Sequence, residues 1–215
     1  WSGDRSILER ADGVLWGAGQ DEETAAMLGE LDCPVVLYTA KRRWPQFSLV
    51  TPDNVAVGRV AAEYLTTLGR PYYAGCMTWN SWFEQERLRG FQEVLTAKNI
   101  SAEVHGPPPG LGSVGPMEIT AWLEGMHRPA AVFCSNDDTA KLVTQVAHDM
   151  GIPVPAEIAV LGADNCELLC RVLKPSLSSI DLRWDEVGYQ AGHLLARLIA
   201  GELSGARITG ALIND

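Results

Sequence analysis

The sequence predicts an α/β fold in which parallel sheets are flanked by helices. Short apolar runs alternate with amphipathic helical stretches along the chain, and this alternation is typical of parallel sheets with helices on both faces. The run Pro34–Tyr38 is apolar throughout, as in strands that are buried on both faces. No apolar run approaches the ~18 residues that a membrane span needs, so we expect no membrane contact.

The order of the elements follows from the periodicity of apolar residues. We expect strands at 13–16, 34–38, 72–76, 130–134, 158–161 and 177–180, and helices at 21–31, 54–68, 84–97, 137–150 and 184–200. In the second helix, Val57, Ala61 and Leu65 recur at helical spacing. Asn54 is a suitable N-cap for it, and Gly69 is a suitable stop.

The charge of the chain argues against nucleic-acid binding by these residues alone. Basic residues number 17 and acidic residues 27 in the 215-residue chain, which gives a formal net charge of −10. Phosphate contacts require clustered Lys and Arg, but the longest basic run is Lys41–Arg43. We expect a solvated loop there.

Residue patterns for metals, cofactors and catalysis are missing from the sequence. The five cysteines include no CxxC pair and the four histidines are scattered, so we expect reduced thiols in a cytoplasmic protein and no metal site. Residues 110–115 match GxGxxG, but Pro107–Pro109 precede them and Pro116 follows. A dinucleotide loop needs a strand before it and a helix after it. With neither GxSxG nor HExxH present, we expect no cofactor and no enzyme activity.

Polar residues that directly follow predicted strands are the first candidates for a binding site. They are Asp53 and Asn54 after Leu49-Val50, Ser135 to Asp138 after the strand ending at Cys134, and Asp164 and Asn165 after the strand ending at Leu161. In open α/β sheets, ligands bind beyond the carboxyl ends of the strands. Helix capping by Asn136 or Asp137, and a turn that starts at Asp164, are the alternative interpretations.

One arginine and two tryptophans complete the candidate set. The guanidinium of Arg87 suits paired hydroxyls or a carboxylate, and the alternative is a solvated arginine paired with Glu84 or Glu86. Trp79, Trp82 and Trp184 could stack on a sugar ring, and we take Trp79 and Trp184 as the candidates. Trp16 and Trp122 lie in apolar patterns and are expected in the core.

Several motifs together resemble one family over almost the whole chain. They are T-x-D-N-x-x-x-G at 51–58, E-R-L-R-G-F at 86–91, S-N-D at 135–137, G-I-P-V-P at 151–155, V-L-G-A-D-N at 160–165, L-S-S-I at 177–180 and G-Y-Q-A at 188–191. Their order resembles the effector-binding core of LacI/GalR-type regulators. The segment D-N-x-E-L-L-C at 164–170, with L-S-S-I, is similar to the sensor domain of xylose operon regulators, which couple it to an AraC-type DNA-binding domain.

The resemblance implies a two-lobed periplasmic-binding-protein-like fold with a sugar in the interlobe cleft. It implies ligand contacts from Arg87, Asn136, Asp137, Asp164, Trp184 and Asp53, and we add Trp79 to this set. The expected N-lobe is 1–76 with 184–208, and the expected C-lobe is 77–183 with 209–215. The family's first strand–helix–strand unit is expected to precede Trp1.

The function implied is sugar sensing for transcription regulation. We expect a monosaccharide effector, D-xylose first, in a cytoplasmic homodimer that contacts DNA only through a domain outside this chain. A periplasmic sugar-binding protein of a transporter shares the fold and is the alternative, while an α/β enzyme would need a nucleophile or a cofactor loop that the sequence does not show.

Overall fold

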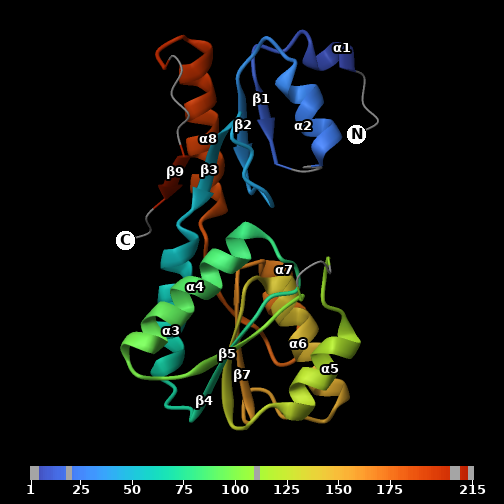
Figure 1. The fold of residues 1–215 in the computed structure, drawn as a ribbon, viewed down its shortest axis with the longest axis vertical. Coiled ribbons are helices and arrows are strands. Elements are labelled where there is room, and N and C mark those ends of the chain that lie inside the picture. Colours follow the sequence, from blue (N-terminus) through green and yellow to red (C-terminus); the bar gives the residue numbers. More distant parts are fainter. Residues whose placement is uncertain (1–4, 18–20, 109–111, 204–208, 213–215) are drawn as a thin grey trace. The chain divides into compact units, whose positions relative to one another are not determined.

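The computed structural model describes residues 5–17, 21–108, 112–203 and 209–212 (Figure 1). The chain divides into two compact units. The first comprises Trp1–Asp53 with Arg183–Asp215, and the second comprises Asn54–Leu182. Among the described residues, no helix combines the length and the apolar character needed to cross a membrane.

The first unit contains a four-stranded parallel sheet in the order β1-β2-β3-β9. Its elements are α1 (Arg5–Leu8), β1 (Val14–Trp16), α2 (Glu22–Gly29), β2 (Val35–Tyr38), β3 (Ser48–Pro52), α8 (Trp184–Ile199) and β9 (Thr209–Leu212). The side chain of Asp21 caps α2 by accepting from the Thr24 amide. Val187 and Ala191 of α8 pack on Val36 and Val50 of the sheet.

The second unit contains a five-stranded parallel sheet in the order β5-β4-β6-β7-β8. The strands are β4 (Tyr72–Cys76), β5 (Ala102–His105), β6 (Ala130–Cys134), β7 (Ile158–Ala163) and β8 (Ser178–Ile180). The helices are α3 (Asn54–Thr66), α4 (Trp82–Ala97), α5 (Pro116–Gly125), α6 (Asp137–Asp149) and α7 (Glu167–Val172).

Alternate residues of β6 enter two separate cores on opposite faces of this sheet. Val132 and Cys134 pack with α5 and α6, whereas Ala131 and Phe133 pack with α3 and α4. This is the period-2 alternation of a strand, and it explains why β6 is apolar at every position. The unit therefore has three layers, with helices on both faces of the sheet (Figure 1).

Helices α3 and α4 approach each other closely because glycines lie at their contact. A Cβ at Gly58 would overlap the carbonyl oxygen of Arg87, and a Cβ at Gly90 would overlap the carbonyl oxygen of Val55. Gly58 thus places the start of α3 directly against the turn of α4 that carries Arg87.

The predicted α/β class is confirmed, and every predicted strand and helix forms with small shifts at its ends. Sequence analysis did not predict β5, because its sequence Ala-Glu-Val-His is half polar and it lies at the edge of the sheet. Trp16 and Trp122 are buried, as expected. Residues 109–111 of the glycine-rich segment and 213–215 of the predicted C-lobe lie outside the described residues.

The predicted lobe boundaries differ from the observed division. Residues 54–76 belong to the second unit, because α3 packs on α4 and β4 pairs with β5 and β6. Residues 209–212 belong to the first unit, since β9 pairs with β3. The pairing partner of a short strand depends on tertiary contacts that its own sequence does not specify.

Candidate functional site

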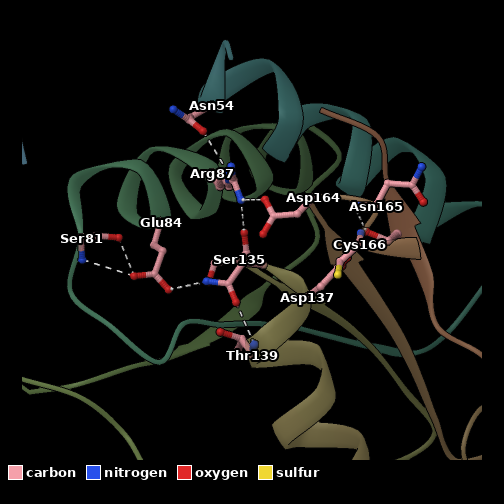
Figure 2. Close-up of polar contacts among 12 residues, drawn as sticks. Asn54, Ser81, Glu84, Arg87, Ser135, Asp137, Thr139, Asp164, Asn165 and Cys166 are labelled. Carbon is pink, nitrogen blue, oxygen red and sulfur yellow. Dashed lines mark hydrogen bonds and ion pairs between the residues drawn. The ribbon is translucent and has the colours of Figure 1, made fainter. Parts of the chain in front are cut away.

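A buried arginine lies at the centre of a polar cluster in the second unit (Figure 2). Arg87 is 2% exposed. Its Nε donates to Asn54 Oδ1 at 2.9 Å, and its Nη1 donates to the carbonyl oxygen of Ser135 at 2.6 Å and to Asp164 Oδ1 at 3.2 Å. These bonds join the start of α3, α4, the β6–α6 connection and the β7–α7 connection. The alternative interpretation of Arg87 as a solvated residue is therefore wrong.

Glu84 lies one helical turn before Arg87 and is fully buried. Its Oε2 accepts from the Ser81 hydroxyl at 2.6 Å and the Ser81 amide at 3.3 Å, and its Oε1 accepts from the Ser135 hydroxyl at 2.8 Å and Asn136 Nδ2 at 3.2 Å. A buried carboxylate is tolerated when donors surround it in this way. The capping-box pattern Ser81-x-x-Glu84 could have indicated the bonds to Ser81, but not those to Ser135 and Asn136, and this role was not predicted.

Asn136 and Asp137 hold the connections on which the site is built. Asn136 Oδ1 accepts from the Thr139 amide at 2.8 Å and caps α6, so the capping interpretation of Asn136 is confirmed. Asp137 is buried, and its Oδ1 accepts from the Ser179 hydroxyl at 2.6 Å. Its Oδ2 accepts from the Cys166 amide at 2.7 Å. Asp137 thereby ties the start of α6 to β8 and to the start of α7.

Asp164 is the acidic member of the cluster that reaches solvent. Its side chain is 29% exposed, against 3% for that of Arg87. Its backbone φ of 123° lies in the left-handed region, which non-glycine residues rarely adopt and which is often found at functional sites. Asp164 therefore combines backbone strain, partial exposure and a bond to the buried Arg87.

Burial dominates the electrostatics of these carboxyl groups. It raises the pKa of Asp164 to about 6; Arg87 opposes this shift and the Asp137 carboxylate adds to it. Burial also raises the pKa of Asp137, although the hydrogen bonds from Ser179 and Cys166 act in the opposite direction. Burial lowers the pKa of Arg87, whereas the negative charges of Asp164, Glu84 and Asp137 act to raise it.

The structure gathers four of the seven predicted site residues into this cluster and adds others to it. Arg87, Asn136, Asp137 and Asp164 are gathered, and the cluster also includes Asn54, Ser81, Glu84, Ser135 and Ser179.

The other three predicted site residues belong to other segments of the structure. Asp53 and Trp184 belong to the first unit, where Trp184 begins α8 and is 36% exposed. Trp79 is 51% exposed and forms an isolated antiparallel bridge with Ser113.

Metal ligation receives no support from the described part of the chain. No group of three or more His, Cys, Asp or Glu side chains there is arranged to hold a metal ion. Within the cluster, Asn136 and Asp164 are partly exposed, and their amide and carboxylate groups are suited to hydrogen bonding with hydroxyl groups.

Comparison with known proteins identifies the family. Residues 62–209 match the model of the periplasmic binding protein-like domain. The chain belongs to this family. The resemblance to LacI/GalR-type effector domains is confirmed by relatives such as the Xylose operon regulatory protein of Haemophilus influenzae.

That relative is 25% identical over 204 residues, which cover 89% of this chain and 52% of the relative. The HTH-type transcriptional repressor PurR of Vibrio vulnificus is 28% identical over 202 residues, which cover 89% of this chain and 58% of the repressor. The chain therefore spans a little over half the length of these curated relatives.

Solved structures agree on the fold. A LacI family transcriptional regulator from Enterococcus faecium with bound ribose has a TM-score of 0.76 and 21% identity, covering 97% of this chain and 78% of the regulator. A periplasmic binding protein/LacI transcriptional regulator from Alkaliphilus metalliredigens, complexed with D-xylulofuranose, has a TM-score of 0.70 and 21% identity, covering 97% of this chain and 75% of the other.

Proposed function

We propose that this chain is the sugar-sensing domain of a bacterial transcriptional regulator. The observation that carries the proposal is the partly exposed Asp164 carboxylate, which the buried Arg87 holds in place at the carboxyl end of β7. This is the edge of a parallel sheet where ligands bind in α/β proteins. The relatives support the same conclusion, since they are named as operon regulators and repressors.

In this proposal Asp164 accepts hydrogen bonds from sugar hydroxyls and Arg87 orients it. The carboxylate is a strong acceptor for hydroxyl donors, and charge-assisted bonds of this kind are short and strong. The bonds of Asn136 and Asp137 within the protein support a positioning role for both residues. The family resemblance assigns Asp53 and Trp184 to the same ligand; these contacts, and that of Trp79, stay predictions.

We take D-xylose as the first candidate effector and D-ribose as the second. The first follows from the names of the xylose operon regulatory proteins, and the second follows from the ribose bound to the Enterococcus faecium regulator. Sugar binding would shift the population of domain conformations. A DNA-binding domain outside this chain would respond, in a cytoplasmic homodimer that has no enzymatic activity.

Calorimetric titration with D-xylose, D-ribose and D-glucose tests the proposal. We expect at least one of these sugars to bind and to raise the melting temperature by mass action. Asp164→Ala should weaken binding roughly 10- to 150-fold, because charge-assisted hydrogen bonds contribute about 1.5–3 kcal/mol. The matched control is Asp149→Ala, at the exposed end of α6, which should leave the affinity unchanged. Absence of binding by all three sugars would contradict the proposal.

The transporter alternative predicts a different property for the complete gene product. A regulator binds operator DNA and releases or retains it when the sugar is added, whereas a transport protein binds the sugar and no DNA. Gel retardation with the promoter region of the neighbouring genes, with and without the sugar, separates the two.

A further inference from the structure

The cluster around Arg87 contains more acid than base. Asp164 contacts the guanidinium, and the carboxyl groups of Glu84 and Asp137 lie close enough for all three to favour its charged form. Among the described residues joined by the bonds of this cluster, Arg87 alone carries a positive charge. With all three carboxyl groups ionised, the cluster has a formal charge of −2.

The guanidinium is already engaged. Its Nε and Nη1 donate to Asn54, to the Ser135 carbonyl and to Asp164, and its Cζ lies 5.0 Å from the ring centre of Phe83. An anionic ligand at Nη1 would have to compete with Asp164, and at any nitrogen of the guanidinium it would meet the negative potential of Asp164, Glu84 and Asp137. An uncharged ligand meets no such competition, because its hydroxyl groups can donate to Asp164.

The helix that begins beside the cluster offers no further attraction for an anion. Free amides at a helix N-terminus, together with the helix dipole, attract negative charge. In α6, the Asn136 side chain already accepts from the Thr139 amide, and Asp137 and Asp138 occupy the first turn. The protein's own acidic groups therefore occupy the positive end of this helix.

We infer that the site selects uncharged sugars and rejects anionic ones, such as sugar phosphates and uronates, and that Asp164 is the residue that sets this selectivity. The inference rests on the proposed function, since it assumes that a sugar binds at this cluster. It adds the charge class of the ligand and the residue that discriminates between classes.

Burial is the main cause of the raised pKa values of Asp164 and Asp137. Burial raises the pKa of Asp164 to about 6 against the opposing effect of Arg87, and the Asp137 carboxylate adds a smaller rise. The pKa of Asp137 is raised as well, chiefly by burial.

The test compares neutral and anionic sugars on the wild-type protein and on Asp164→Asn at pH 7.5. D-Xylose and D-ribose are the neutral probes. D-Glucuronate, which is a xylose ring with an added carboxylate, and D-ribose 5-phosphate are the anionic probes. The matched control is Asp149→Asn, which makes the same chemical change at an exposed position.

For the wild type we expect a neutral pentose to bind at least tenfold more tightly than its anionic counterpart, a difference of about 1.4 kcal/mol or more. Asp164→Asn keeps the shape of the side chain and removes its charge. It should weaken pentose binding and strengthen anion binding. The ratio of the affinity for the neutral sugar to that for the anionic sugar should therefore fall at least tenfold, whereas Asp149→Asn should leave this ratio unchanged.

Two results would overturn the inference and leave sugar sensing intact. One is an anionic sugar that binds the wild type as tightly as its neutral parent. The other is a ratio of neutral-sugar to anionic-sugar affinity that is the same in Asp164→Asn as in the wild type. In that case the shape of the site, and not the charge of Asp164, would exclude anions. If neither pentose, neither anion nor D-glucose binds, the result would instead contradict the proposed function, and the inference would fall with it.

Discussion

Arg87 and Arg89 lie two residues apart on α4 and have opposite environments. Arg87 is 2% exposed and its bonds reach residues 33, 48 and 77 positions away in the sequence. The side chain of Arg89 is 57% exposed and pairs with Glu93, four residues further along the same helix. Residues two apart on a helix face different directions. Arg87 therefore points into the protein and bonds to several segments, whereas Arg89 remains a surface charge. Five substitutions test this contrast.

Arg87→Ala should have the largest effect on stability. It leaves Glu84, Asp137 and Asp164 without their cation, and removal of one partner from a buried ion pair typically costs about 3–5 kcal/mol. We expect a loss of unfolding free energy in this range, measured by urea denaturation without sugar. A loss below about 1 kcal/mol, as is usual for surface pairs, would show that the cluster does not depend on its arginine.

Gly58→Ala should have the next largest effect, because the added Cβ would overlap the carbonyl oxygen of Arg87. Overpacking of this kind typically costs about 1–3 kcal/mol. We expect lower stability in urea denaturation and weaker sugar binding, since α3 must move away from Arg87. In Gly188→Ala, an added Cβ meets no atom within 4 Å, so the protein should gain about 0.5–1 kcal/mol from helix propensity alone. Equal effects of the two substitutions would refute this explanation.

Asp164→Asn should change the pH dependence of stability. The folded protein keeps the proton of Asp164 up to about pH 6, whereas the ordinary pKa of this group is 3.8. Between these values the folded state binds more protons than the unfolded state, so the unfolding free energy falls as pH rises. We expect this contribution, roughly 1–2 kcal/mol after allowance for partial exposure, to be lost in Asp164→Asn. Identical slopes of stability between pH 4 and pH 6 would contradict the assignment.

Arg89→Ala should have the smallest effect. Surface pairs at this helical spacing contribute about 0.3–0.5 kcal/mol and are screened by salt. We expect a change of this size in urea denaturation and no change in sugar affinity. A loss comparable to that of Arg87→Ala would mean that exposure does not explain the difference between the two arginines.

Most of the site could be predicted from the sequence, but the way its residues act could not. Arg87, Asn136, Asp137 and Asp164 were identified from strand ends and from the family resemblance, and the structure brings them together. Glu84 was missed, because a capping box does not reveal that its carboxylate also binds Ser135, 51 residues away. The hydrogen bond from Ser179 to Asp137 could not be predicted either, since no local pattern relates residues 42 positions apart.

The sequence by itself determined the α/β class, the order of the main strands and helices, and the family. These features follow from local patterns, because the period of apolar residues and the residues at helix ends act over a few positions. Two features were decided by the tertiary structure alone. One is the assignment of residues 54–76 to the second unit and of β9 to the first. The other is the grouping of Arg87 with the carboxyl groups of Glu84, Asp137 and Asp164. Strand pairing and burial depend on contacts between distant segments, and the burial that raises the pKa of Asp164 exists only after those segments have packed together.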